Sequence, residues 1–105
     1  MIVDRKPTVE SLGKAFAEHL RKEPDVRELW VAEDEDGFVV SIITDEIDPE
    51  RERHLYAYAS PIQRKLPDAL FEVHVSNPRY YPSLSGDQLR TAVLPSGARR
   101  IQLKH

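Results

Sequence analysis

The chain has 105 residues, a length typical of one folded domain. Hydrophobic residues make up 40% of it and charged residues 31%, which excludes the composition of an intrinsically disordered protein. It has no cysteine, which excludes disulfides, thiolate nucleophiles and cysteine-based metal sites, and its net charge of −3 argues against a general nucleic-acid binder.

The first residues lack the apolar stretch of a secretion signal, and no apolar run approaches the roughly 18 residues of a membrane span. We therefore expect a cytoplasmic protein that folds as a single domain over residues 1–105. Neither a membrane nor nucleic acid is expected among its partners.

A first helix is predicted to begin after Thr8, whose hydroxyl suits the N-cap position, and to end before Pro24. Its apolar positions recur at the spacing of one helical face: Val9, Leu12, Phe16 and Leu20. Gly13 lies inside this helix and costs about 1 kcal/mol relative to alanine, so packing rather than intrinsic propensity must stabilise it.

Two strands are predicted next, over residues 28–32 and 38–44, because the apolar pattern changes to a period of two. The side chains expected to face the core are Leu29, Val31, Val40 and Ile42. Those expected on the opposite face of the sheet are Trp30, Ala32, Val39, Ser41 and Ile43.

Between these strands lies an acidic run, Glu33 to Asp36, followed by Gly37. Asp-Gly between apolar runs is a strong hairpin signal, because glycine adopts a positive φ without steric cost. A calcium-binding EF-hand loop aligned on this run would need oxygen ligands at Ala32 and Ile43, which are apolar. We therefore predict a solvated hairpin tip without a metal site.

A second helix is predicted to begin at Asp48, with Pro49 in its first turn, and to end at Pro67. Its buried stripe is predicted to comprise Leu55, Ala59, Ile62 and Leu66. Pro61 must kink or restart this helix, and Ser60 is predicted to cap the restarted turn.

A third strand is predicted over residues 70–76, with Phe71, Val73 and Val75 inward and Glu72 and His74 outward. Residues 77–105 are expected to form an irregular C-terminal segment that packs on the domain. Within it, a short helical turn is predicted at 87–92, a turn at 94–97 and a last short strand at 98–103.

These elements predict an α/β fold, more specifically an α+β sandwich. Its order is α-β-β-α-β, with a small mixed sheet and two helices on one face. The third strand follows the second through a helix, so the right-handed crossover rule makes it parallel to the second strand or to a neighbour of it.

The outer face of the predicted sheet is more apolar than a face left in water. This face could be covered either by the C-terminal segment of the same chain or by a second copy in a homodimer. The predicted interface residues are Trp30, Val39, Ile43 and His74. The charge distribution is compatible with both arrangements, because residues 28–50 contain no lysine or arginine, whereas the C-terminal segment is mainly basic. This basic segment could contact the acidic region of its own chain or that of a second copy.

No motif of a known catalytic class is present. The four histidines, His19, His54, His74 and His105, form no HExxH pattern, and GxSxG, Walker A and GxGxxG are absent. We predict no catalytic, cofactor-binding or metal-binding residues and no cofactor. The favoured function is a non-catalytic interaction or regulatory module, whose partner is a second copy or an unidentified protein. The alternative is a degenerate nucleotidyltransferase-like or metal-binding domain, with Asp36 and nearby carboxylates as its acidic groups.

Residues 24–82 and the closing LPSGARRIQLKH resemble small bacterial proteins of similar length with no assigned function. The strand order is similar to that of the minimal nucleotidyltransferases of toxin–antitoxin systems, although only Asp36 stands where that family has paired aspartates. FEVHV, which is separated from Asn77-Pro78 by Ser76 alone, resembles the last strand of the cytosolic domain of cation diffusion facilitators. That resemblance implies a metal-binding role for His74.

Overall fold

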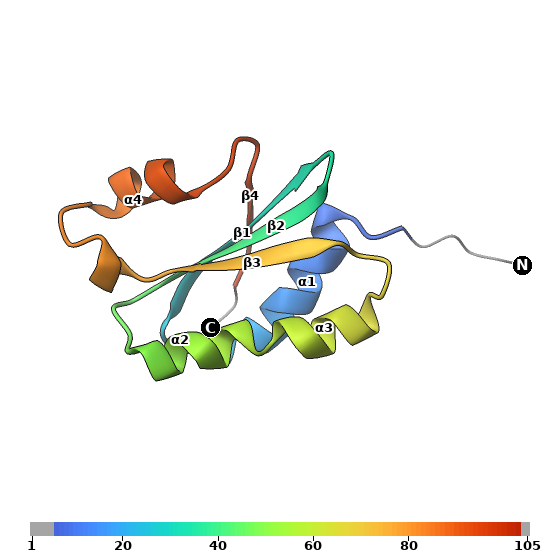
Figure 1. Cartoon of the computed structure of the whole chain (residues 1–105), viewed down its shortest axis with the longest axis horizontal. Coiled ribbons are helices and arrows are strands. Elements are labelled where there is room, and N and C mark those ends of the chain that lie inside the picture. Colours follow the sequence, from blue (N-terminus) through green and yellow to red (C-terminus); the bar gives the residue numbers. More distant parts are fainter. Residues whose placement is uncertain (1–5, 104–105) are drawn as a thin grey trace, which may run out of the picture.

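Figure 1 shows the computed structural model, which describes residues 6–103, and it confirms the α/β class. The elements are α1 (Val9–Leu20), β1 (Val26–Asp34), β2 (Gly37–Thr44), α2 (Pro49–Tyr56), α3 (Ala59–Lys65), β3 (Phe71–Ser76), the 3₁₀ turn η1 (Pro78–Tyr80), α4 (Gly86–Val93) and β4 (Arg99–Ile101). The predicted order is therefore confirmed, including the short C-terminal strand.

The sheet is mixed, with the strand order β3-β2-β1-β4. β1 pairs antiparallel with both β2 and β4, whereas β2 pairs parallel with β3. The parallel pair confirms the predicted crossover through the second helical region. β3 and β4 are consequently the two edges of the sheet.

The core lies between one face of this sheet and the helices α1, α2 and α3; in Figure 1, α2 and α3 lie below the strands and α1 passes behind β3. The predicted inward residues of β1 and β2 are fully buried there, and those of β3 pack against them: Leu29, Val31, Val40, Ile42, Phe71, Val73 and Val75. The helices contribute the side chains Leu12, Phe16, Leu20, Leu55 and Ile62, none of which is exposed.

α1 begins at the predicted cap. The Thr8 hydroxyl accepts a hydrogen bond from the Ser11 amide at 2.9 Å, and the Ser11 hydroxyl accepts one from the Thr8 amide at 2.8 Å. Gly13 faces β4, where an added Cβ would lie 2.6 Å from Cδ1 of Ile101. The glycine that weakens the helix therefore lets β4 approach it.

The second helical region is interrupted as predicted, but its second cap was predicted wrongly. Asp48 caps α2 by accepting a hydrogen bond from the Arg51 amide at 2.8 Å, and Pro61 lies in the first turn of α3. Ser60 lies inside α3 and instead accepts a hydrogen bond from Arg64 at 3.3 Å. The residue before α3, Tyr58, keeps a helical backbone, so the chain offers no extended residue of the kind that forms a side-chain cap.

The hairpin tip comprises Glu35 and Asp36, because β1 continues to Asp34. The Asp34 carboxylate accepts a hydrogen bond from the Asp36 amide at 2.8 Å. Gly37 has a φ of +132°, and a Cβ added to it would lie 2.5 Å from the carbonyl oxygen of Leu70. The turn is thus packed against the start of β3.

α4 lies on the opposite side of the sheet from α1, α2 and α3 (Figure 1). On this outer face Ile43 is 6% exposed and Ser41 is 1% exposed, and the Ser41 hydroxyl has no hydrogen-bond partner within residues 6–103. Glu72 and His74 on the same face are exposed. The C-terminal segment therefore covers part of the outer face, as one of the two alternatives predicted, and leaves the β3 side open.

Candidate functional site

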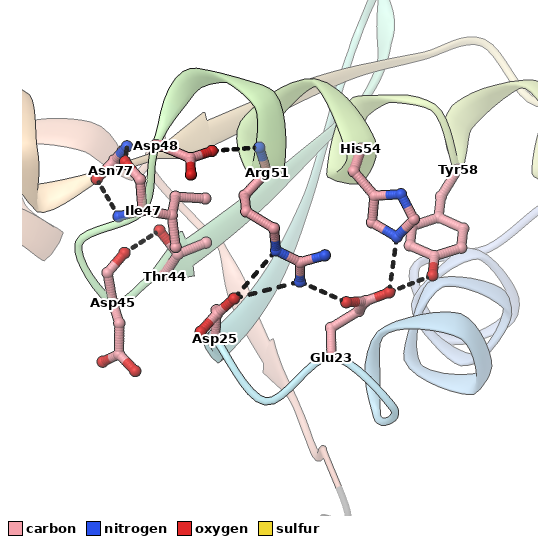
Figure 2. A network of polar contacts seen from close by, with 10 residues as sticks. All are labelled: Glu23, Asp25, Thr44, Asp45, Ile47, Asp48, Arg51, His54, Tyr58 and Asn77. Carbon is pink, nitrogen blue, oxygen red and sulfur yellow. Dashed lines mark hydrogen bonds and ion pairs between the residues drawn. The ribbon is translucent and has the colours of Figure 1, made fainter.

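The most concentrated polar network surrounds Glu23, which lies in the loop between α1 and β1 and is 7% exposed (Figure 2). Its carboxylate accepts hydrogen bonds from Nη2 of Arg51 at 2.7 Å, from Nε2 of His54 at 3.0 Å and from the Tyr58 hydroxyl. Arg51 also contacts the Asp25 carboxylate at 3.2 Å. One buried carboxylate thus joins the start of β1 to α2 and to the residue that precedes α3.

The shifted pKa values of Glu23 and Tyr58 oppose proton transfer by these two groups at neutral pH. Burial raises the pKa of Glu23, but hydrogen bonds from Tyr58, Arg51 and His54 outweigh it and lower the pKa to about 2. Burial and the Glu23 carboxylate raise the pKa of Tyr58 to about 12. A general acid or base works best with a pKa near the operating pH. We therefore assign this network to stability.

A second network surrounds Asn77, which is fully buried just after β3 (Figure 2). Its amide nitrogen donates to the Ile47 carbonyl at 2.7 Å and to Glu52 at 3.3 Å. Its amide oxygen accepts from the backbone amides of Ile47 at 3.2 Å and Arg79 at 3.1 Å. These bonds fix the end of β3 to the connection between β2 and α2.

A third network attaches α4 to the sheet. Glu28, 8% exposed on β1, accepts from Nε of Arg90 at 2.8 Å, from Nη2 of Arg90 at 2.6 Å and from Nε1 of Trp30 at 2.8 Å. The hydrogen bonds from Arg90 lower the pKa of Glu28, against the effect of burial. Arg100 lies 6.0 Å from the ring centroid of Trp30. Contact between the basic C-terminal segment and the acidic region therefore occurs within the chain at Glu28.

The acidic run and the histidines do not converge. Glu33, Asp34, Glu35 and Asp36 are all exposed. His54 contacts Glu23 and His74 contacts Glu72, so the two lie in different surroundings, and His105 is outside the described residues. Within residues 6–103 no group of three histidine, cysteine or acidic side chains is placed to hold a metal ion.

The exposed apolar side chains gather around β3. Among the described residues, the large hydrophobic side chains that are exposed are Tyr56 (39%), Leu70 (71%), Tyr80 (56%) and Tyr81 (38%). Leu70 directly precedes β3, Tyr80 and Tyr81 follow it, and the Tyr56 hydroxyl accepts a hydrogen bond from the Val75 amide at 3.1 Å. We call β3 together with these four residues the β3 surface.

Two hollows lie at the β3 surface, and Val39 contributes to both. The hollow at the start of β3 is lined by residues that include Asp36, Val39, Leu70 and Glu72. The hollow at the end of β3 is lined by residues that include Val39, Tyr56, His74, Tyr81 and Leu94. The shared residue makes these hollows neighbours on the outer face of β2 and β3.

The structure divides the predicted interface residues. His74 belongs to the β3 surface and Val39 lies beside it. Ile43 is buried within the chain, and Trp30 is partly buried in the Glu28 network. The four side chains of the β3 surface that lie outside the strand are not among the predicted interface residues. The adjacent tyrosines Tyr80 and Tyr81, in a segment otherwise rich in polar residues and proline, were the signal that could have indicated them.

Comparison with known proteins gives no family: no family model, no curated protein and no solved structure matches the chain. The resemblances to small bacterial proteins, to minimal nucleotidyltransferases and to cation diffusion facilitators therefore stay predictions. None of the helices within residues 6–103 is long and apolar enough to cross a membrane.

Proposed function

We propose that this chain is a cytoplasmic, non-catalytic interaction module that works as a homodimer through the β3 surface. The observation that carries this proposal is the position of its exposed large hydrophobic side chains, which lie before, beside and after one edge strand. Exposed large hydrophobic side chains are typical of protein interfaces, and here Leu70 lines one hollow at the β3 surface while Tyr56 and Tyr81 line the other. Their position favours an interface at β3 over one at Trp30 and Ile43.

The open edge supports the same proposal. β3 has six residues and pairs within residues 6–103 with β2 alone, whereas the opposite edge strand, β4, has three. An edge strand presents unpaired backbone donors and acceptors to which a further strand can bind. The β3 surface thus combines directional hydrogen-bonding groups with apolar area.

Sedimentation equilibrium of the full chain tests this function. We expect the wild type to form dimers at micromolar concentrations, and a Leu70→Ser/Tyr80→Ser double variant to shift toward monomer while its circular dichroism stays unchanged. Both side chains are more than half exposed, so their loss should affect association more than folding.

The matched control is Lys14→Ser, an exposed position on α1 on the other side of the sheet, which should dimerise as the wild type does. A wild type that sediments as a monomer at every concentration reached would contradict the proposed homodimer. So would a double variant that dimerises as strongly as the wild type.

A further inference from the structure

The backbone groups that β3 presents to solvent follow from one hydrogen bond. The Val75 amide donates to the Tyr56 hydroxyl, so it points away from β2. The amide and carbonyl of one strand residue point to the same side, and successive residues alternate. Phe71, Val73 and Val75 therefore direct their backbone groups outward, and Glu72 and His74 direct theirs toward β2.

We propose that two copies of the chain pair antiparallel along β3, with Val73 on the two-fold axis. This inference rests on the proposed homodimer and gives its register. In this register Val73 pairs with Val73 of the second copy and Phe71 with Val75, each as a hydrogen-bonded pair. Glu72 of each copy then lies opposite His74 of the other.

Side-chain complementarity favours this register over its neighbours. A two-fold axis one residue earlier would place Glu72 opposite Glu72 of the second copy, and like charges directly opposite destabilise a strand pair. An axis one residue later would place His74 opposite His74 and leave both without a carboxylate partner, whereas in the proposed register each Glu72 carboxylate can accept a hydrogen bond from His74 of the other copy. Both side chains are exposed (75% for Glu72 and 57% for His74) and contact each other at 3.2 Å within one chain, so pairing exchanges this contact in each copy for an equivalent contact between the copies. The sequence FEVHV is thus self-complementary when read antiparallel.

The flanking apolar residues fit the same arrangement. Antiparallel pairing places the start of β3 in one copy beside the end of β3 in the other. Leu70, the most exposed large hydrophobic residue within residues 6–103, would therefore lie near the segment of the second copy that carries Tyr80 and Tyr81. Side chains exposed at both ends of β3 would cover one another across the axis.

Tyr56 limits the strength of the pairing. Its hydroxyl accepts a hydrogen bond from the Val75 amide. In the proposed dimer the same amide donates to the Phe71 carbonyl of the second copy. The hydroxyl must move aside for the outer pairs to form, whereas the central pair at Val73 is open. The dimer is accordingly expected to be reversible.

Charge exchange at the paired positions tests the register by sedimentation equilibrium. His74→Glu would place carboxylates opposite each other at both symmetric sites, and Glu72→Lys would remove the carboxylate that accepts a hydrogen bond from His74. Each variant should weaken dimerisation roughly tenfold. The combined Glu72→Lys/His74→Glu variant places Lys opposite Glu at both sites and should recover wild-type affinity. If the double variant is instead weaker than both single variants, the register is wrong.

Disulfide trapping gives an independent test, because the chain has no cysteine of its own. The experiment mixes Glu72→Cys chains with His74→Cys chains and oxidises them. In the proposed register the Cα atom of position 72 in one chain lies about 4.5 Å from the Cα atom of position 74 in the other, a distance that a disulfide can span. In a dimer of either variant alone, the Cα atoms of the two cysteines lie about 8 Å apart, beyond the roughly 7 Å that a disulfide can span. We expect efficient cross-linking in the mixture only.

The outcomes separate this inference from the function on which it rests. A wild-type dimer whose mixed cysteine variants cross-link no better than either variant alone would overturn the register and leave the homodimer in place. A monomeric wild type would remove both.

Discussion

Glu23→Gln should lower the free energy of unfolding at neutral pH by about 3 kcal/mol, as measured by urea denaturation. Glutamine keeps the shape of the side chain and removes its charge, so it imitates protonated glutamate. Lowering the Glu23 pKa from 4.5 to about 2 corresponds to this energy at about 1.4 kcal/mol per pH unit. The side chain is 9% exposed, so solvent screens these hydrogen bonds little.

The pH dependence has a definite sign. The folded-state pKa of Glu23 lies below its unfolded value, so the stabilisation is fully present above pH 4.5 and is lost as the pH falls toward 2. The difference between wild type and Glu23→Gln should therefore shrink over that interval. Glu18→Gln is the control, because Glu18 forms an exposed ion pair with Lys65 at 3.5 Å and should change stability little. A difference between wild type and Glu23→Gln that stays constant from pH 7 to pH 3 would contradict the assignment.

Gly37→Ala should destabilise the chain by about 3 kcal/mol in the same measurement. A backbone φ of +132° is strained for any residue with a Cβ, which costs about 1 to 3 kcal/mol. The added carbon would also lie 2.5 Å from the Leu70 carbonyl oxygen, which is fixed by a hydrogen bond from the Phe38 amide at 2.8 Å. Relief of this clash requires the hairpin and β3 to move apart.

Alanine variants of two other glycines distinguish the cost of backbone strain from the cost of the steric clash with Leu70. Gly97 has a φ of +77° and no atom within 4 Å of an added Cβ, so Gly97→Ala should show backbone strain alone. Gly86 begins α4, has neither constraint and should accept alanine at no cost. Equal losses for Gly37→Ala and Gly97→Ala would show that contact with Leu70 contributes nothing.

The predictions that the structure confirms rest on local physical signals. The Thr8 cap, the Asp48-Pro49 helix start and the Asp36-Gly37 hairpin each depend on residues close together in the sequence. Alternation along β1, β2 and β3 then identified the core face, and the chirality of the crossover gave the parallel pair.

The features that sequence reasoning missed depend on contacts between distant segments. Glu23 meets Arg51 and Tyr58, and Asn77 meets Ile47, across about 30 residues of intervening chain, and no periodic pattern marks such pairs. The prediction that Ser60 caps the restarted turn was wrong because the backbone remains helical through Tyr58, which the position of Pro61 alone did not reveal. The β3 surface depends on β3 being an edge strand, and the strand order is a property of the whole sheet that no local sequence pattern gives.

The most direct test of the central claim is amide hydrogen exchange measured by NMR at two protein concentrations. The Val73 amide points outward from the sheet edge and should form a hydrogen bond to the second copy on the two-fold axis. We predict that it exchanges rapidly in dilute samples and is protected at concentrations where the dimer is populated, whereas the Lys14 amide inside α1 exchanges at a rate independent of concentration. A Val73 amide that exchanges equally fast at both concentrations, in a sample shown to be dimeric at the higher one, would contradict an interface at the β3 edge.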